Sequence, residues 1–443
     1  MMRKFIFALI ALLCFAGAQG ARKNKEKTPE YLPLPEKYDG SMATLDTLAY
    51  RSLELPDSLR PIFLNYVARH GARYMSSHKK TQTLEHVIRV AAERGVLTPE
   101  GKAFGELLHR LDSLSEGRWG LLSPEGKAEQ RFLGKWLLRE FPDLIGKGNV
   151  SAVSSYVPRV VQTMYTLSET ILTTDSLEPD ATFSTSEGKK FDPLVRFFES
   201  DKQYEDFLDR GPWTPIYSSW LRTRVPSAPA GRLFTPGSGL KEDILRTLSM
   251  HIYSVLQSLR CSGLGVPTTR WMSEDEYRSC WEAENLDKYL RRTWTSVSDE
   301  PARAVTPLLM ALISGMDQAG RSELLKEQNL KDTSDALSAK MYFGHAETLM
   351  PLFSLMNLPG CSVLVNDWAD LPSEWKDYEI VPMGANLVIT LLRSKRGYLH
   401  AAVCLNGKWV EPMRDGRIIV PYVALRAYWL ERAQAALHTS GGK

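Results

Sequence analysis

The chain has 443 residues, of which 43% are hydrophobic and 24% are charged, a composition typical of a globular protein with one large or two moderate domains. Its formal net charge is only +3. A chain so close to neutrality gives no support for bulk nucleic-acid binding, so an anionic ligand would have to be bound by a local cluster of positive charge.

Residues 1–20 have the three parts of a secretory signal peptide: a short basic part, an apolar run over residues 5–15 and small residues at a cleavage site. The apolar run is too short to span a membrane, and no other stretch is apolar enough to do so. Leu13 before Cys14 is too bulky for the usual lipobox, so we do not expect a lipid anchor. The mature protein is therefore expected to be exported, to the periplasm or the medium.

Residues 21–44 are rich in Lys, Glu and Pro and predict a loose leader. Four cysteines follow it, and in an oxidising compartment they can form one or two disulfides. Proximity in sequence suggests pairing Cys261 with Cys280 and Cys361 with Cys404. Because none has C-x-x-C spacing, the cysteines predict neither a zinc site nor a redox motif.

The first strong strand signal is the apolar run at residues 62–67. Residues 69–73 follow it with the sequence Arg-His-Gly-Ala-Arg, and ligands of α/β proteins bind at the carboxyl ends of strands. Arg69 and Arg73 can grip phosphate oxygens in bidentate fashion, and their charge favours a neutral, nucleophilic His70. The segment predicts a phosphoryl-transfer site, the alternative being a surface loop with scattered basic residues.

Amphipathic helices are expected at residues 98–116 and 123–141, the second beginning with an N-cap serine followed by proline. Residues 149–154 suit a strand, and a helix follows near 158–173. Arg159 lies where that strand has ended and the helix begins. It therefore repeats the geometry expected for the basic residues after the first strand.

Residues 185–325 differ from the rest, because they are rich in Trp, Pro and Arg and carry little strand signal. Helices are expected within them at 241–260, 273–292 and 302–315. We interpret this block as a mostly helical cap inserted into an α/β domain.

Sheet character returns after the block. The expected elements are strands at 339–343, 377–382, 386–393 and 398–404 and helices near 346–357 and 421–437. A sheet interrupted by a helical block predicts an α/β fold with the sheet sandwiched by helices. The α/β domain is then discontinuous, with residues 45–184 as its first part and 326–437 as its second.

His345 and Glu347 follow the strand at 339–343 and begin a helix, whose N-terminus favours phosphate. If this strand lies beside the one at 62–67, His345 faces the same pocket as His70, and Glu347 can protonate a leaving oxygen. Taken alone, each is more simply a structural histidine or a first-turn carboxylate favourable to the helix dipole. The combination with the arginine-rich loop favours the catalytic interpretation.

On these residues the chain resembles the histidine phosphatase superfamily, in its acid-phosphatase and phytase branch, and within it the multiple inositol-polyphosphate phosphatases. Residues 69–73 match the family's signature, and residues 345–347 match the His-Ala-Glu of the inositol-polyphosphate group. Softer similarity covers residues 122–126 and 382–387. The signature usually continues to a proline where this chain has Met75, which relaxes the loop but removes no catalytic atom.

The resemblance implies that His70 is a nucleophile forming a phosphohistidine and that Glu347 is the proton donor. The implied phosphate-binding residues are Arg69, Arg73, Arg159 and His345. It further implies hydrolysis of inositol hexakisphosphate (phytate) and lower inositol polyphosphates as small-molecule substrates, and neither a cofactor nor a metal. The cap is the least matched region, and it tends to set substrate choice in this family.

Two other functions stay open at this point: a broad acid phosphatase acting on sugar phosphates and other monoesters, and an exported phosphate-ligand binder without turnover. A metal-dependent hydrolase is disfavoured, because the eight histidines are scattered without an H-x-H or H-E-x-x-H pattern. A highly phosphorylated substrate needs further cations, and the sequence offers candidates only by residue type. His78, Lys79, Lys80 and Arg303 are candidates, but solvated surface charge is the better interpretation of each.

Overall fold

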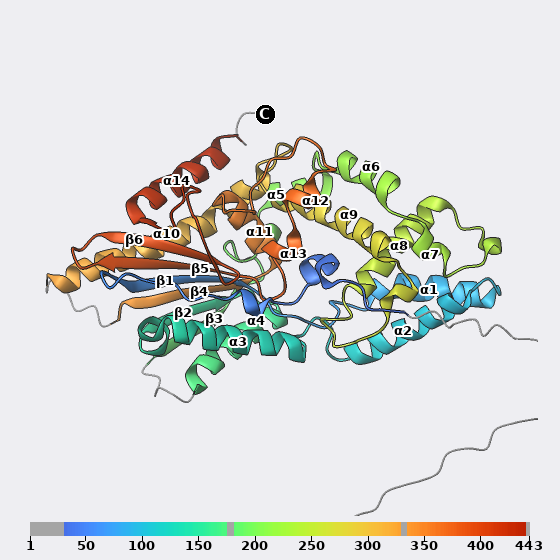
Figure 1. Cartoon of the computed structure of the whole chain (residues 1–443), viewed down its shortest axis with the longest axis horizontal. Coiled ribbons are helices and arrows are strands. Elements are labelled where there is room, and N and C mark those ends of the chain that lie inside the picture. The colour runs from blue at the N-terminus through green and yellow to red at the C-terminus, as the bar shows by residue number, and fades with distance from the viewer. Residues whose placement is uncertain (1–30, 175–180, 329–334, 440–443) are drawn as a thin grey trace, which may run out of the picture. The chain divides into compact units, whose positions relative to one another are not determined.

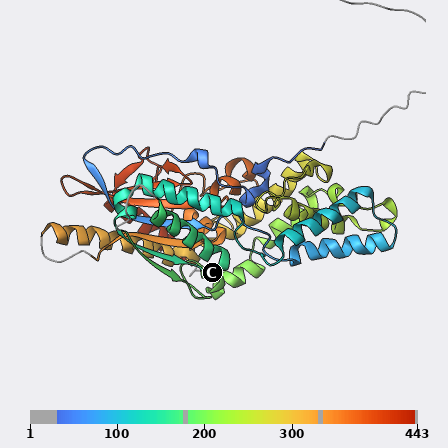
Figure 2. The same ribbon diagram turned by 90° about the horizontal axis from the view of Figure 1, so that it is seen from below.

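The computed structural model describes residues 31–174, 181–328 and 335–439, so the predicted signal peptide lies outside the described residues. The described chain from Leu32 onward belongs to one compact unit. A single sheet with helices on both faces forms its centre (Figures 1 and 2). The predicted α/β fold with a sandwiched sheet is confirmed.

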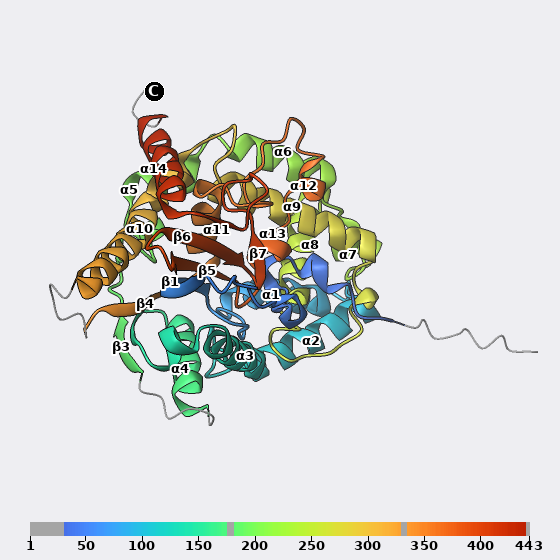
Figure 3. The ribbon, with the colours of Figure 1, turned by 60° about the vertical axis from the view of Figure 1, so that its left-hand side comes forward.

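The strands of the sheet are β1 (Leu59–Arg69), β2 (Asn149–Ser154), β3 (Thr182–Glu187), β4 (Leu337–Gly344), β5 (Asn386–Ser394), β6 (Leu399–Leu405), β7 (Lys408–Val410) and β8 (Ile419–Pro421). Their order is β3-β2-β4-β1-β5-β6-β7, with β8 paired to β6. Figure 3 shows β4, β1, β5 and β6 in this sequence across the sheet. The first four strands in this order are parallel, whereas β5 and β6 continue the sheet antiparallel. The carboxyl ends of β1, β2 and β4 therefore share one edge.

The helices are α1 (Lys79–Glu93), α2 (Pro99–Ser115), α3 (Pro124–Glu140), α4 (Pro158–Thr173), α5 (Lys202–Arg210), α6 (Thr214–Arg224), α7 (Ala228–Gly231), α8 (Glu242–Leu256), α9 (Glu274–Arg292), α10 (Glu300–Glu327), α11 (Ala346–Leu355), α12 (Leu371–Glu374), α13 (Asp377–Ile380) and α14 (Tyr422–Thr439). Helices α3 and α4 cover one face of the sheet, and α10, α11 and α14 cover the other (Figure 1). The sequence reasoning missed α1 and β3.

Strand β1 is buried on both faces, which explains its continuous apolar run. Phe63 and Val67 belong to the hydrophobic cluster under α10 and α11, whereas Leu64 and Tyr66 belong to the cluster under α3 and α4. Because alternate side chains of a strand point to opposite faces, the strand is anchored from both sides. Its last residue therefore emerges at a well-defined position.

Helices α1 and α2 precede the predicted cap in sequence, but α1 packs between α2 and α8, and α8 belongs to the predicted cap (Figures 1 and 2). Helix α10 begins inside the predicted cap and packs on β1. The boundaries of the predicted insertion at 185–325 stay a prediction.

The strand expected at residues 377–382 is wrong. Residues Asp377–Ile380 form the short helix α13 instead, and the fully buried Asp377 carboxylate accepts hydrogen bonds there. The end of the predicted loose leader also differs, since Glu36–Met42 form a largely buried 3-10 segment called η1. Buried polar contacts determine the conformation of both segments, and hydrophobic periodicity does not report such contacts.

The predicted disulfides are wrong as well, because all four described cysteines are free and buried. Cys361 lies in the cluster under α10 and α11, and Cys404 lies in the cluster under α3 and α4. Cys261 and Cys280 also fall into different clusters. Sequence proximity therefore misjudged the pairs. None of the helices in the described part of the chain is long and apolar enough to cross a bilayer.

Candidate active site

The loop after β1 is fastened by backbone hydrogen bonds to two neighbouring segments. The His70 N–H donates to Gly344 O at 3.2 Å, and His70 O accepts from Gly384 N at 3.1 Å. The buried ring places Nδ1 2.9 Å from Gly71 O. Because a carbonyl only accepts, Nδ1 carries the proton, and Nε2 keeps its lone pair for attack.

Helix α3 presses against this loop, and glycine is required where the two meet. A Cβ on Gly71 would lie 2.7 Å from Gly126 O, and a Cβ on Gly126 would lie 2.0 Å from Ala72 O. The α3 carboxylate of Glu129 accepts from Ala72 N at 2.7 Å and from Leu45 N at 3.1 Å. Burial raises the pKa of Glu129 to about 7, although these two N–H groups favour its charge.

A second imidazole lies beside the first because β1 and β4 are adjacent and parallel. The ring centroids of His70 and His345 are 5.7 Å apart, with an angle of 75° between the planes. His345 Nε2 lies 3.1 Å from Arg196 Nη1 and 3.0 Å from Ser155 Oγ, and Nδ1 lies 3.4 Å from Arg159 Nη2. If Nε2 accepts from the nearer arginine, Nδ1–H and the Arg159 guanidinium can both donate to one anion.

Four arginines contribute buried donors without acceptors. Within the described chain, Nε has no hydrogen-bond partner in Arg69, Arg73, Arg159 and Arg196. Buried donors are normally paired, and an unpaired one is costly. An anion bound among these arginines would supply the missing acceptors and charge-assisted hydrogen bonds.

The electrostatics of the site keep both imidazoles neutral. Burial, followed by the charges of Arg159 and Arg69, holds the pKa of His70 well below its usual range. Burial and Arg159 do the same for the pKa of His345. Burial and neighbouring positive charge also lower the pKa of Arg69 and of Arg159 to about 10, which leaves both arginines charged at neutral pH.

Glu347 is the second residue of α11, and its carboxylate is held in the ionised form. Burial alone would raise its pKa, but the charges of Arg292 of α9 and of Arg69 lower the pKa to about 2. A phosphate dianion bound nearby would oppose these arginines and raise the pKa again.

The structure brings all six predicted site residues together: His70, His345, Glu347, Arg69, Arg73 and Arg159. The chemical role of each stays a prediction. Sequence reasoning missed Arg196, Arg292 and Glu129. Arg196 and Arg292 do not follow a predicted strand, and Glu129 lies in a helix with an ordinary amphipathic pattern. The sequence therefore carries no local signal for any of the three.

Two of the additional cation candidates are engaged elsewhere. His78 Nε2 lies 3.0 Å from a carboxylate oxygen of Glu85 and 3.0 Å from one of Asp112. Arg303 lies 2.7 Å from Asp201 and also pairs with Glu300. Lys79 is exposed. The exposed His78 agrees with the surface-charge interpretation, whereas Arg303, with a side chain only 17% exposed, is part of a largely buried ion-pair network.

The sequence profile of the histidine phosphatase superfamily (branch 2) matches residues 62–196 and 299–403, which is more than half of the chain. The chain therefore belongs to that superfamily, and it is a histidine phosphatase hydrolase. The matched stretches carry all six predicted site residues. The region between them, which holds α5 to α9, lies outside the profile.

Among curated proteins, the chain is similar to multiple inositol polyphosphate phosphatase 1 of Gallus gallus, with 23% identity over 394 residues, 86% of this chain and 84% of the relative. Among solved structures it is similar to the multiple inositol polyphosphate phosphatase of Bifidobacterium longum in complex with inositol hexasulfate. That match has a TM-score of 0.72 at 16% identity and covers 89% of this chain and 97% of the other. The phytase of D. castellii matches with a TM-score of 0.63 at 15% identity, over 94% and 90%. At these identities the structural matches establish the fold.

Proposed function

We propose that the protein is an exported phosphomonoesterase that hydrolyses inositol hexakisphosphate and lower inositol polyphosphates through a phosphohistidine intermediate. The observation that carries the proposal is the set of four buried guanidinium Nε donors without acceptors around two neutral imidazoles. The names of the Gallus gallus and Bifidobacterium longum relatives support inositol polyphosphates as the substrate class.

In the first step, Nε2 of His70 attacks the phosphorus, the N–P bond forms and the P–O bond to the inositol breaks. The hydrogen bond from Nδ1 to Gly71 O orients the ring and stabilises the charge that develops on it. Protonated Glu347 gives its proton to the leaving alkoxide. In the second step water attacks the phosphohistidine while the Glu347 carboxylate takes a proton from that water. This divides one difficult displacement into two easier ones.

The arginines neutralise the charge on the transferring phosphoryl group. Arg69, Arg73, Arg159 and Arg196 place unpaired guanidinium donors around His70 and His345 before substrate arrives. Removing one such preorganised donor typically costs about 100- to 1,000-fold in rate.

The decisive experiment is product analysis of the purified mature protein on inositol hexakisphosphate, with the His70→Ala variant as the control. We expect stepwise release of inorganic phosphate by the natural chain and no turnover by the variant. Near-normal turnover by His70→Ala would rule out the covalent scheme.

The same assay separates the two alternatives. Equally fast cleavage of sugar phosphates and inositol hexakisphosphate would favour the broad acid phosphatase. Tight binding of inositol hexakisphosphate without phosphate release would identify a binding protein. The presence of Glu347 argues against the latter, because a binder has no need of an acid for the leaving group.

Export is proposed from the predicted signal peptide at residues 1–20. Expression of the full chain should yield an extracytoplasmic protein whose N-terminus, read by mass spectrometry, lies after the small residues that precede residue 21. Retention of Met1 in the isolated protein would contradict the proposal.

A further inference from the structure

Arg69 is held in place by two backbone carbonyls that lie far from it in sequence. Its Nη1 donates to Ser41 O in η1 and to Val381 O, at 2.6 Å, immediately after α13. Both hydrogens of Nη1 are used in this way, while Nε has no partner within the described residues. The direction of the guanidinium therefore depends on where these two carbonyls lie.

A single buried residue ties both carbonyl segments together. The Asp377 carboxylate accepts from the backbone N–H of Ser41 at 2.8 Å, and the Asp377 carbonyl accepts from the backbone N–H of Val381 at 2.8 Å. The side chain of Asp377 has no exposed surface. Asp377 thus holds the two residues, Ser41 and Val381, whose carbonyls accept from the Arg69 guanidinium.

Helix α9 in turn holds Asp377 through three side chains on one helical face. Trp281 Nε1 donates to its carboxylate at 2.9 Å, Lys288 Nζ lies 2.6 Å from it, and Asn285 Oδ1 accepts from its backbone N–H at 2.9 Å. Lys288 also donates to Ser41 Oγ at 2.8 Å. The spacing of four and three residues along α9 places these groups on the same side of the helix.

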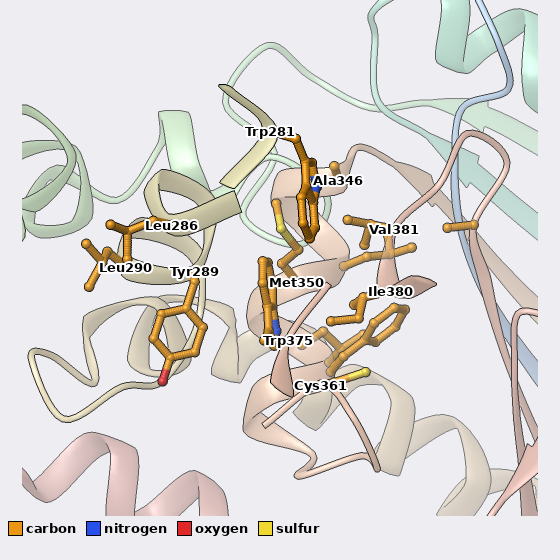
Figure 4. Close-up of a cluster of buried hydrophobic side chains, with 14 of the residues drawn as sticks. Trp281, Leu286, Tyr289, Leu290, Ala346, Met350, Cys361, Trp375, Ile380 and Val381 are labelled. Atoms are coloured by element: carbon orange, nitrogen blue, oxygen red, sulfur yellow. The ribbon is translucent and has the colours of Figure 1, made fainter. Parts of the chain in front are cut away.

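Hydrophobic packing surrounds this polar contact. Figure 4 shows Trp281 and Tyr289 of α9 beside the segment that carries Trp375 and Val381. The ring centroids of Tyr289 and Trp375 are 5.6 Å apart. Such packing excludes water, so the hydrogen bond between Asp377 and Lys288 is electrostatically stronger than it would be in water.

The location of α9 gives this contact its meaning. The helix lies wholly between the two stretches that match the superfamily profile, whereas Arg69 lies inside the first and Asp377 inside the second. A buried ion pair contributes little net stability compared with well-packed apolar residues. A role in fixing the geometry of a functional arginine accounts for the pair better.

We propose that Asp377 and Lys288 are positioning residues that hold Arg69 in its phosphate-binding geometry, so that α9 sets the affinity of the site for a phosphoryl group. The inference rests on the proposed function, in which Arg69 contacts the phosphate. Besides Asp377, Lys288 also pairs with Glu284 of the same helix, at 3.1 Å.

The test compares Asp377→Asn and Lys288→Met with a matched control on the same helix. Glu276→Gln removes an α9 ion pair with Arg232, at 2.7 Å, in the first turn of the helix, far along it from Lys288. Binding of inorganic phosphate is measured by calorimetry, and kcat and KM are measured on an aryl phosphate. We expect each test variant to lose about 10- to 100-fold in phosphate affinity and in kcat/KM, since small misplacements at a reacting centre are costly. The control should keep both values.

A double-mutant cycle with Arg69→Ala distinguishes positioning from a general loss of structure. If Asp377 acts through Arg69, the Arg69→Ala/Asp377→Asn variant should bind phosphate as weakly as Arg69→Ala alone. Independent, multiplicative losses would overturn the inference. If Lys288→Met does not fold, Lys288→Gln, which retains a donor, should restore most of the affinity; equal loss in a folded Lys288→Gln variant would also contradict a hydrogen-bonding role.

The failure of this inference is distinguishable from failure of the proposed function. Normal phosphate affinity in Asp377→Asn, with strong loss in Arg69→Ala, would refute positioning by α9 and leave the phosphatase scheme intact. Normal affinity and turnover in Arg69→Ala would refute the proposed phosphate site itself.

Discussion

Among the single residues of the site, Glu347 is held in its charged form against the effect of its own burial. Its pKa is about 2, because the charges of Arg292 and Arg69 outweigh the effect of burial. In the proposed mechanism Glu347 gives up a proton, so bound substrate would have to raise this pKa. The pH profile of the enzyme should therefore report the charges around Glu347.

Replacing Arg292 with Met should move the alkaline limb of the kcat profile to higher pH. Arg292 is the charge that most lowers the pKa of Glu347, and without it the carboxylate loses stabilisation and its pKa rises. A step that needs protonated Glu347 then persists to higher pH. The measurement is kcat against pH on an alkyl phosphate, and an unmoved limb would show that Glu347 does not control it.

Replacing Glu347 with Gln should slow alkyl phosphates more than aryl phosphates. An alkoxide is a poor leaving group that needs a proton, whereas a phenolate departs without one. General acid catalysis typically contributes about 100- to 10,000-fold, so a difference of at least about tenfold between the two substrates is expected. Equal slowing of both esters would remove Glu347 from the acid role.

At the scale of elements, the contact between α3 and the loop after β1 sets the position of His70. The N-terminal turn of α3 approaches Ala72 so closely that Gly126 has no room for a Cβ, and Glu129 holds the Ala72 N–H from the next turn. The path of the loop therefore depends on this helix.

Gly126→Ala should displace the loop, because its Cβ would lie 2.0 Å from the Ala72 carbonyl oxygen. We expect a loss of about 1–3 kcal/mol in the free energy of unfolding, as for an overpacked core, and a fall in kcat. Gly105→Ala in α2 is the control, since its Cβ would meet only an Ile88 methyl group at 3.3 Å. Urea unfolding and kinetics measure both, and a fully active Gly126→Ala variant would contradict the close contact.

At the scale of the whole molecule, the folded chain is held together by packing and not by disulfide bonds between its described cysteines. The described cysteines are free, and burial raises the pKa of the Cys261 and Cys361 thiols to about 12. Both thiols are protonated and poorly reactive at neutral pH.

Addition of a thiol reductant should therefore leave the thermal midpoint of the purified protein unchanged, even if the protein is isolated from an oxidising compartment. Scanning calorimetry with and without reductant measures this. A marked fall in the midpoint on reduction, with a disulfide identified by mass spectrometry in the sample without reductant, would show that cysteines pair in solution.

The strongest sequence predictions concerned segments in which local pattern and chemistry coincide. The run at 62–67 became β1, the N-cap at Ser123 begins α3, and the two histidine motifs lie side by side. The weak predictions concerned segments without local pattern. The strand expected at 377–382 is α13, because a buried carboxylate bound by α9 decides that segment.

The motifs that hold Arg69, His70 and His345 were enough to indicate phosphoryl transfer, because their residue types match that chemistry. The packing of the folded chain determined which further groups lie beside them. Arg196, Arg292 and the Asp377–Lys288 pair come from distant segments and reach the site through packing, and long-range contacts of this kind leave no periodic trace in the sequence.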